Sequence, residues 1–388
     1  ASTCASGRTI GEAMNLYEFC QMIIEWLVGL INNIWYWLGD VLPGGLGGFF
    51  TDVGDFAASD GHIAVMTILL EVLVVLIVAI VNVLNFIWID RKLSGRIFDF
   101  YGPYYVGYRI GGWLQNIADG MKLFVKEIIT PRDADKLGFV LAPAIFVSSS
   151  FLILATIPLS PDFGVATNIA GDFVPAGVLF AFAAFAIAPF SILLAGWSSN
   201  NKYTLIGGMR SAAQMMSYEI PLLLAVASVF LLAGDFGFVG VVEAQEDVWF
   251  AIPLFIGFIV FLVCIAAEVE VTPFDLPEAE AELVEGWTTE YCGMRFGFFM
   301  MTSYLRGYAG GALATALFLG GWNGPSLIPE EIWFLIKAYC VFVVIEWMRW
   351  SVPRVRVDQI LNLGWKRLLP LAVLNLMVAV ALKSMGWF

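Results

Sequence analysis

Long uncharged segments recur along this chain of 388 residues, and they constrain its fold more than any other feature. A helix needs roughly 20 mostly apolar residues to cross the hydrocarbon core of a bilayer. Since 60% of the chain is hydrophobic and only 14% is charged, whereas soluble domains are about half apolar, the sequence predicts an all-α polytopic membrane protein. The uncharged segments are 72–89, 138–161, 173–201, 250–267 and 307–329.

Eight membrane spans fit this pattern, together with amphipathic surface helices. Residues 62–388 are expected to form one eight-helix membrane domain, and residues 1–61 an N-terminal extension. Within the extension, residues 19–38 carry polar groups near helical spacing, which predicts a helix lying in the membrane interface; a ninth span is the alternative. The predicted spans are about 64–89, 138–160, 174–197, 211–233, 250–268, 294–317, 332–350 and 367–386.

Basic residues predict the orientation of these spans. The segment 90–137 holds eight Lys and Arg residues, whereas segments 160–174, 234–250 and 318–331 hold none. Because basic loops stay on the cytoplasmic side, we expect the loops after the first, third, fifth and seventh spans to be cytoplasmic. Both termini would then lie outside a cell membrane that the chain crosses several times.

Composition also narrows the chemistry. The five cysteines are scattered without a CxxC spacing, and the one histidine is His62. Zinc, haem or iron–sulfur ligation by this chain alone is therefore not expected. The net charge of −13 does not indicate nucleic-acid binding. The N-terminus shows no basic region of the kind that begins a cleavable signal peptide.

The densest acid cluster directly follows the uncharged segment 250–267. It reads "EVEVTPFDLPEAEAELVEG" and contains seven carboxylates and no basic residue. A helix after its first proline would place Asp275 at the N-cap and Glu278 in a capping box, with Glu278, Glu282 and Glu285 on one face. Like charges beside a low-dielectric wall share protons as a coupled set. The alternative is a solvated acidic loop.

Charged residues also lie inside the predicted spans, where they are costly and usually paired or functional. Glu219 precedes Pro221, which interrupts the helical hydrogen-bond ladder. It is either a proton or ion site or a protonated acid bonded to a neighbouring helix. Arg306 is expected to pair with an acid on another span, and Glu346 with Arg349 on its own helix face.

Two segments after the first span carry aromatic and amphipathic signals. Residues 90–107 combine charge, aromatic residues and a Gly-Pro turn. Residues 114–127 predict an amphipathic surface helix with Asp119 and Lys122 facing water. Together they could frame an opening for a lipid-like substrate; packing on the membrane surface is the alternative.

Seven motifs occur in the order found in the H subunit of respiratory complex I, which this chain resembles from about residue 72 to 382. They are "RKLSGRI", "YGP", "IADGMKL", "GWSSNNKY", "SYEIP", "TPFDLPEAEAELVEGWTTEYCGMRF" and "PRVRVDQILNLGWKRLLP". The resemblance implies a respiratory-chain subunit that encloses a quinone chamber with two hydrophilic subunits. It also implies the first carboxylate relay, which couples quinone reduction to proton translocation.

The resemblance further implies that the chain carries no redox cofactor and meets quinone, its isoprenoid substrate, at the interface with partner subunits. Those partners would be other membrane-arm subunits and the hydrophilic iron–sulfur subunits, in a lipid membrane and without nucleic acid. By motif, the proton relay would comprise Glu219, Glu268, Asp275, Glu278, Glu280, Glu282 and Glu290. The quinone chamber and its entrance would comprise Arg91, Arg96, Phe98, Phe100, Asp119 and Lys122.

Departures from the family pattern matter for this reading. Ser303 and Ala186 stand where the family often has acids. Aromatic residues, including Phe98 and Phe100, replace charge and amide groups near the implied entrance, which favours an isoprenoid acceptor other than ubiquinone. The electron donor stays open between NADH, a reduced deazaflavin coenzyme and ferredoxin.

Three other functions compete with this one. The membrane subunit of a membrane-bound hydrogenase is similar in the acid loop but has no quinone partner. A stand-alone secondary transporter usually shows two related halves, and no such repeat is visible here. A passive membrane anchor does not account for Glu219 or for the acid loop.

Overall fold

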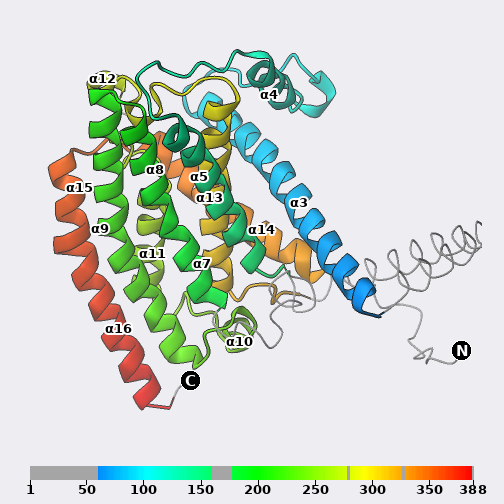
Figure 1. Ribbon diagram of the computed structural model, residues 1–388. Helices are drawn as coiled ribbons and strands as arrows, with labels where there is room; N and C mark the ends of the chain where they lie inside the picture. Colours follow the sequence, from blue (N-terminus) through cyan, green and yellow to red (C-terminus); the bar gives the residue numbers. More distant parts are fainter. Residues whose placement is uncertain (1–59, 160–176, 278–279, 326–327, 387–388) are drawn as a thin grey trace, which may run out of the picture.

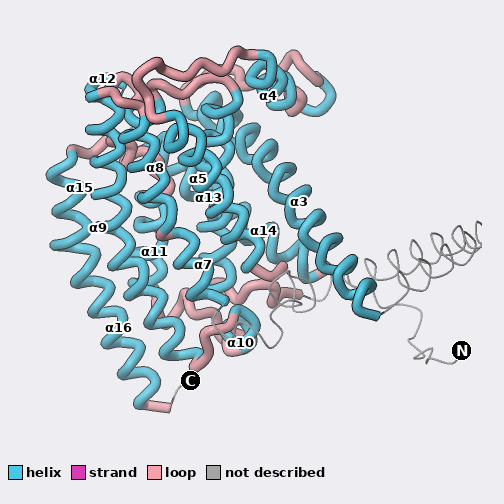
Figure 2. The backbone as a smooth tube through the Cα atoms, in the orientation of Figure 1, coloured by secondary structure: helices cyan, strands magenta, loops and turns pink. Residues whose placement is uncertain are grey.

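The computed structural model describes residues 60–159, 177–277, 280–325 and 328–386, and for residues 60–71 and 280–281 it describes the backbone alone. Within these ranges the chain forms helices, turns and loops and no strand (Figure 2). The predicted all-α class is confirmed. The expected interfacial helix at 19–38 and Glu278 lie outside the described residues.

Five helical stretches of the described chain are long and apolar enough to cross a membrane. The first is the long helix α3 (Asp60–Ile97), which lies along one side of the bundle (Figure 1). The others are α5 (Lys136–Thr156), α7 (Gly177–Phe185) with α8 (Ile187–Ser198), α9 (Lys202–Ala233), and α15 (Val357–Leu363) continued by the π-helical turn η3 (Gly364–Leu368) and α16 (Leu369–Ser384).

Helices occupy the other three predicted spans as well, although they are less apolar or shorter. The apolar helix α11 (Phe255–Glu268) has 14 residues, and α13 (Met294–Phe318) and α14 (Glu330–Ser351) have 25 and 22. The last two contain Arg306, Lys337 and Glu346, all of them buried inside the bundle. Charges turned inward avoid the lipid, so the helices can still cross the membrane.

Capping explains why α9 begins before its predicted span. The side chain of Asn201 accepts a hydrogen bond from the backbone N–H of Tyr203, which starts the helix at Lys202 rather than near residue 211. At the other end Gly234 adopts a left-handed conformation with φ of 77°, which stops it. The helix therefore reaches beyond the apolar layer and brings Arg210 and Ser211 to the acid loop.

Short helices lie at the two ends of the bundle. The amphipathic helix predicted within 114–127 is confirmed as α4 (Gln115–Val125), which lies with α12 (Glu280–Leu283) at one end, opposite α10 (Phe238–Glu243) and the C-terminus (Figure 1). Single 3-10 turns form η1 (Tyr108–Ile110) and η2 (Gly286–Thr288).

Small residues let the central helices approach one another closely. A Cβ at Gly311 of α13 would lie 2.9 Å from the carbonyl oxygen of Ala338 on α14. A Cβ at Gly207 of α9 would lie 2.8 Å from the backbone of Gly286 and Trp287 at η2. Such contacts are typical of packed membrane helices. They fix the acid loop against α9.

The helix expected after the first proline of the acid loop forms only in part. Among the described residues of this segment α12 is the α-helix, and it begins at Glu280, so Asp275 is not its N-cap and pairs with Arg354 instead. Leu276 precedes Pro277, which disfavours helical backbone at that residue, and the burial of Phe274 and Leu276 draws the segment inward. Glu285 precedes η2 with φ of −141°, so it does not continue a helical face with Glu282.

Candidate functional site

A buried ion pair lies at the centre of the site. Glu268, at the end of α11, pairs with Arg306 in the middle of α13 at 2.7 Å, and their side chains are 4% and 1% exposed. The expected pairing of Arg306 with an acid on another span is thus confirmed. Its guanidinium carbon also lies 4.7 Å from the centre of the Phe185 ring. Arg306 Nε and Nη1 and the second oxygen of Glu268 have no hydrogen-bond partner within the described chain.

Glu270 adds a second carboxylate beside this pair. It is 8% exposed, and the hydroxyl of Ser211 on α9 donates to its carboxylate. The side-chain amide of Gln214, also on α9, donates to the carbonyl oxygens of Ala267 and Phe274 at 2.9 and 2.8 Å. These bonds hold the start of the acid loop on α9.

Three carboxylates act electrostatically on Arg306. Besides Glu268 and Glu270, the third is the half-buried Glu219 of α9. Three acids therefore face one buried base, and full ionisation would leave excess negative charge in a low-dielectric interior. Such a group is suited to take up and release protons.

A second group of charges joins α3, α13 and α14. Asp90 of α3 accepts hydrogen bonds from the hydroxyl of Tyr304 at 3.0 Å and from the indole N–H of Trp350 at 2.6 Å. Arg349 lies 3.5 Å from Asp90 and 3.4 Å from Glu346, which confirms the expected pairing of Glu346 with Arg349. Asp90 and Glu346 are 4% and 2% exposed.

Asp90 was not among the predicted site residues. Its position next to Arg91 and Lys92 made it look like part of a charged helix end. The available signal was the position of Asp90 at the end of one apolar span and of Glu346 one turn before Arg349 in another. This pattern does not indicate which helices are neighbours in the fold.

A cavity of about 70 Å³ lies between the two charge groups. Ser303 of α13 faces this space. The apolar part of its wall includes Val269, Met300 and Phe342. Its polar wall is formed by Glu270, Ser303, Tyr304, Glu346 and Arg349.

The acid loop does not hold its described carboxylates as one crowded set. Three of them have separate partners, because basic and amide groups of other elements reach the loop. The contacts are Asp275 with Arg354 at 2.8 Å, Glu282 with Arg210 at 2.8 Å, and Glu290 with Asn201 at 2.7 Å. The shared face expected for Glu282 and Glu285 is wrong. Only the backbone of Glu280 is described.

Asp119 links α4 to α3. It pairs with Arg91 at 2.5 Å and Lys122 at 3.3 Å and accepts a hydrogen bond from Gln115 at 3.0 Å. Its side chain is 29% exposed, so it faces water only in part, whereas Lys122 is exposed as predicted. Desolvation raises the pKa of Asp119, but the hydrogen bond and charge of Arg91, with the bonds from Lys122 and Gln115, outweigh it. The net result is a pKa below its usual value of 3.8.

The other predicted entrance residues lie on the surface beside this ion pair. Arg96 and Phe100 are exposed. Phe98 is also exposed, but its ring meets the indole of Trp350 edge-on, with 5.8 Å between the ring centres. The apolar face of α4 is uncovered by the described chain; its exposed residues are Leu114, Ile117, Met121, Phe124 and Val125.

An apolar pocket of about 730 Å³ lies between α3, α5 and α13. This size is within the usual range for small-molecule sites, roughly 300–1,000 Å³. Leu76, Pro143, Phe151 and Phe298 are among its lining residues, and Arg295 is the charged one. The pocket can accommodate an apolar, chain-like molecule.

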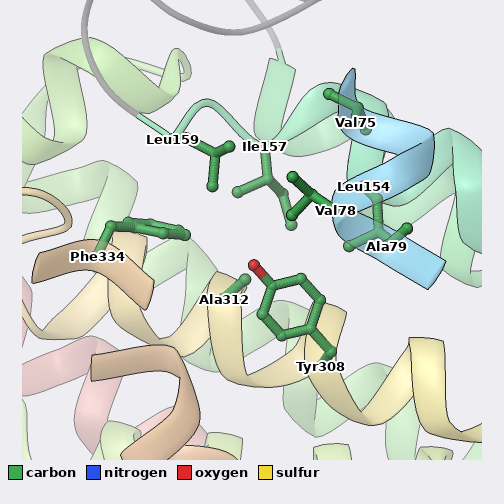
Figure 3. Close-up of a pocket in the computed structure, with 9 residues that line it drawn as sticks. All are labelled: Val75, Val78, Ala79, Leu154, Ile157, Leu159, Tyr308, Ala312 and Phe334. Atoms are coloured by element: carbon green, nitrogen blue, oxygen red, sulfur yellow. The ribbon is translucent and has the colours of Figure 1, made fainter. Parts of the chain in front are cut away.

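A smaller apolar cavity of about 20 Å³ is lined by Val75, Val78 and Ala79 of α3 (Figure 3). Figure 3 shows the hydroxyl of Tyr308 pointing into it, between Phe334 and Val78. Its volume is far below that of a ligand site. Among the described residues no group of three His, Cys, Asp or Glu side chains is placed to hold a metal ion.

A helical bundle with apolar spans and buried, paired acids and arginines is a polytopic membrane protein. The sequence matches the family model described as NADH dehydrogenase over residues 70–380. It is 44% identical over 299 residues to the H subunit of NADH-quinone oxidoreductase from Bacillus thuringiensis (strain Al Hakam), an alignment covering 76% of this chain and 88% of that protein. The same figures hold for the corresponding H subunits from Bacillus cereus and Bacillus anthracis.

The chain therefore belongs to the NADH dehydrogenase family, as an H subunit of complex I. The family predicted from its motifs is confirmed, and with it a membrane-embedded subunit of an oxidoreductase complex. The division at residue 61 stays a prediction, since residues 1–59 are not described.

Proposed function

We propose that this chain is the membrane subunit of a quinone oxidoreductase that forms part of the quinone chamber and begins the carboxylate relay to the proton path. The observation that carries the proposal is the buried Glu268–Arg306 pair directly behind the acid loop. Burying two charges in a membrane bundle is costly, so their presence there favours a role in charge movement over simple packing.

The proposed quinone chamber is supported by an apolar pocket and by charged and aromatic groups on α3 and α4. The pocket between α3, α5 and α13 offers an apolar volume for an isoprenoid tail. Charged and aromatic groups at the nearby end of α3 and on α4 would meet the quinone head. We assign this role to Arg91, Arg96, Phe98, Phe100, Asp119 and Lys122, and expect the aromatic surface to select an acceptor other than ubiquinone.

The proposed proton relay is supported by the series of acids that continues from the acid loop to Glu268 and Glu219 inside the bundle. We assign proton transfer to Glu219, Glu268, Asp275, Glu278, Glu280, Glu282 and Glu290. A carboxylate held near one arginine and further acids changes its proton occupancy when a neighbouring charge appears. Reduction of quinone in the adjacent chamber would supply that change of charge.

The proposed orientation has the acid loop in the cytoplasm and both termini outside. The basic segment 90–137 includes α4, which lies at the same end of the bundle as α12, while α16 ends at the opposite end (Figure 1). The exposed apolar face of α4 and the aromatic residues near it would meet the hydrophilic iron–sulfur subunits and membrane lipids. Other membrane-arm subunits would cover the remaining bundle surface.

The test uses the complex purified through a tag on this chain. We expect iron–sulfur subunits to co-purify and the complex to reduce a naphthoquinone analogue with NADH faster than it reduces decylubiquinone. We also expect Glu268→Gln or Glu219→Gln to lower proton uptake into liposomes. Unchanged uptake in both variants would refute the relay. A complex that evolves hydrogen and reduces no quinone would instead identify the hydrogenase-type function, and a chain that purifies alone would indicate a transporter.

A further inference from the structure

We propose that Glu346 of α14 is a proton-carrying residue of this chain and exchanges protons with Glu270 through the cavity beside Ser303. The inference rests on the proposed function, because it extends the relay by a branch. It assigns to Glu346 a role beyond that of a counter-ion for Arg349, which was the expectation from sequence.

The first argument is the charge count around Arg349. Asp90 and Glu346 lie at nearly equal distances from its guanidinium, 3.5 and 3.4 Å. Two buried carboxylates thus share one arginine. If both were ionised the group would carry one uncompensated negative charge in the interior, and one bound proton removes it.

The second argument is the division of hydrogen bonds within that group. Asp90 accepts from Tyr304 and Trp350 as well as from Arg349, so its ionised form is well supported. Glu346 accepts from Arg349 and has the Asp90 carboxyl beside it. The exchangeable proton of the group is therefore best placed on Glu346, the member that lines the cavity.

The third argument is the cavity itself. It has about 70 Å³ of water-accessible space, whereas a buried water needs roughly 10–15 Å³ of such space and two to four polar partners. The carboxylates of Glu270 and Glu346 and the hydroxyls of Ser303 and Tyr304 supply those partners. The space is therefore suited to a short water chain between the two charge groups.

The transfer involves only protons. An O–H bond of protonated Glu270 breaks as its proton joins a cavity water, and that water or the next releases another proton to the Glu346 carboxylate. Glu270 becomes negative, Glu346 becomes neutral, and no electron moves. The step avoids any need for a titratable group at Ser303.

The test measures protons taken up per electron by the purified complex in liposomes, with NADH and decylubiquinone. We expect Glu346→Gln and Glu270→Gln each to lower this ratio at least twofold. Asp90 still pairs with Arg349 in the first variant, so the arginine keeps a partner. The matched control is Glu246→Gln on the exposed segment after α10, which should leave the ratio unchanged.

A rescue separates proton transfer from packing. Ser303→Glu places a carboxyl in the same cavity, so combined with Glu346→Gln it should restore the proton ratio. If Glu346→Gln prevents assembly, if Ser303→Glu does not restore it, and if Glu346→Asp also fails to assemble, Glu346 has a structural role and the inference is overturned. If Glu268→Gln lowers the ratio and the two cavity variants do not, this branch fails while the proposed function stands; if Glu268→Gln has no effect either, the relay itself fails.

Discussion

Replacement of Arg306 by methionine tests the energetics of the buried pair most directly. Met has a similar length and no charge, so Arg306→Met leaves the Glu268 carboxylate in a bundle interior where it is 4% exposed. Removing one partner of a buried ion pair typically costs about 3–5 kcal/mol. Because every 1.4 kcal/mol is tenfold, the unfolding equilibrium constant should increase by a factor between about 100 and several thousand.

The double variant shows whether the cost comes from the isolated charge. Combining Arg306→Met with Glu268→Gln removes both charges, and such replacements are often close to neutral. We therefore expect the double variant to be more stable than Arg306→Met alone. The matched control is the Arg210–Glu282 pair, which has a similar separation of 2.8 Å but a Glu282 side chain 58% exposed. Arg210→Met should cost less than about 1 kcal/mol.

The assay is a titration of the full chain in bicelles with sodium dodecyl sulfate, followed by tryptophan fluorescence. The chain has 14 tryptophans, among them the fully buried Trp287, so unfolding should change the signal strongly. A loss below about 1 kcal/mol in Arg306→Met contradicts the value expected for a desolvated pair. A double variant that loses as much as the sum of the single variants contradicts the coupling.

Three further predictions address other parts of the fold. Lys337 donates to the carbonyl oxygens of Leu319, Gly321 and Asn323 at 2.7, 3.0 and 2.8 Å, so Lys337→Met should cost about 1–3 kcal/mol in the same titration. Gly207→Ala should loosen the acid loop and speed its proteolysis, because its Cβ meets backbone at 2.8 Å, whereas Gly120→Ala meets nothing within 4 Å and should not. The pKa of Asp119 is lowered by its partners, so its contribution to stability is full above 3.8 and is lost as the pH falls through the folded-state pKa. Hydrogen exchange should show α4 losing protection at such low pH, and Asp119→Asn should remove that dependence.

The positions of the helices could largely be predicted because the signal is local, although among the described residues five helical stretches, not eight, are long and apolar enough to cross a membrane. Apolar length decides whether a segment can cross the bilayer, and that property is carried by consecutive residues. The amphipathic helix α4 could be predicted because the spacing of its apolar and polar residues is also a local signal. The pairing of Glu346 with Arg349 followed from helical spacing alone.

The acid loop shows where local reasoning failed. A capping box and a shared helical face both assume that the segment continues as one helix. The chain instead follows its buried residues Phe274 and Leu276, and Asp275 and Glu282 pair with arginines from distant elements. No local pattern records that Arg210 and Arg354 would arrive there.

The order of residues is enough to establish that this chain is a bundle of membrane helices, that the charges inside its spans need partners, and to which family it belongs. The meeting of Asp90, Glu346 and Arg349 from two helices, and the polar cavity that separates them from Glu270, became visible only in the folded chain. The physical reason is that the apolar length of each segment decides by itself whether the segment can cross the membrane. Which helices pack together depends on several helices at once, because charges far apart in the chain must neutralise one another in the interior.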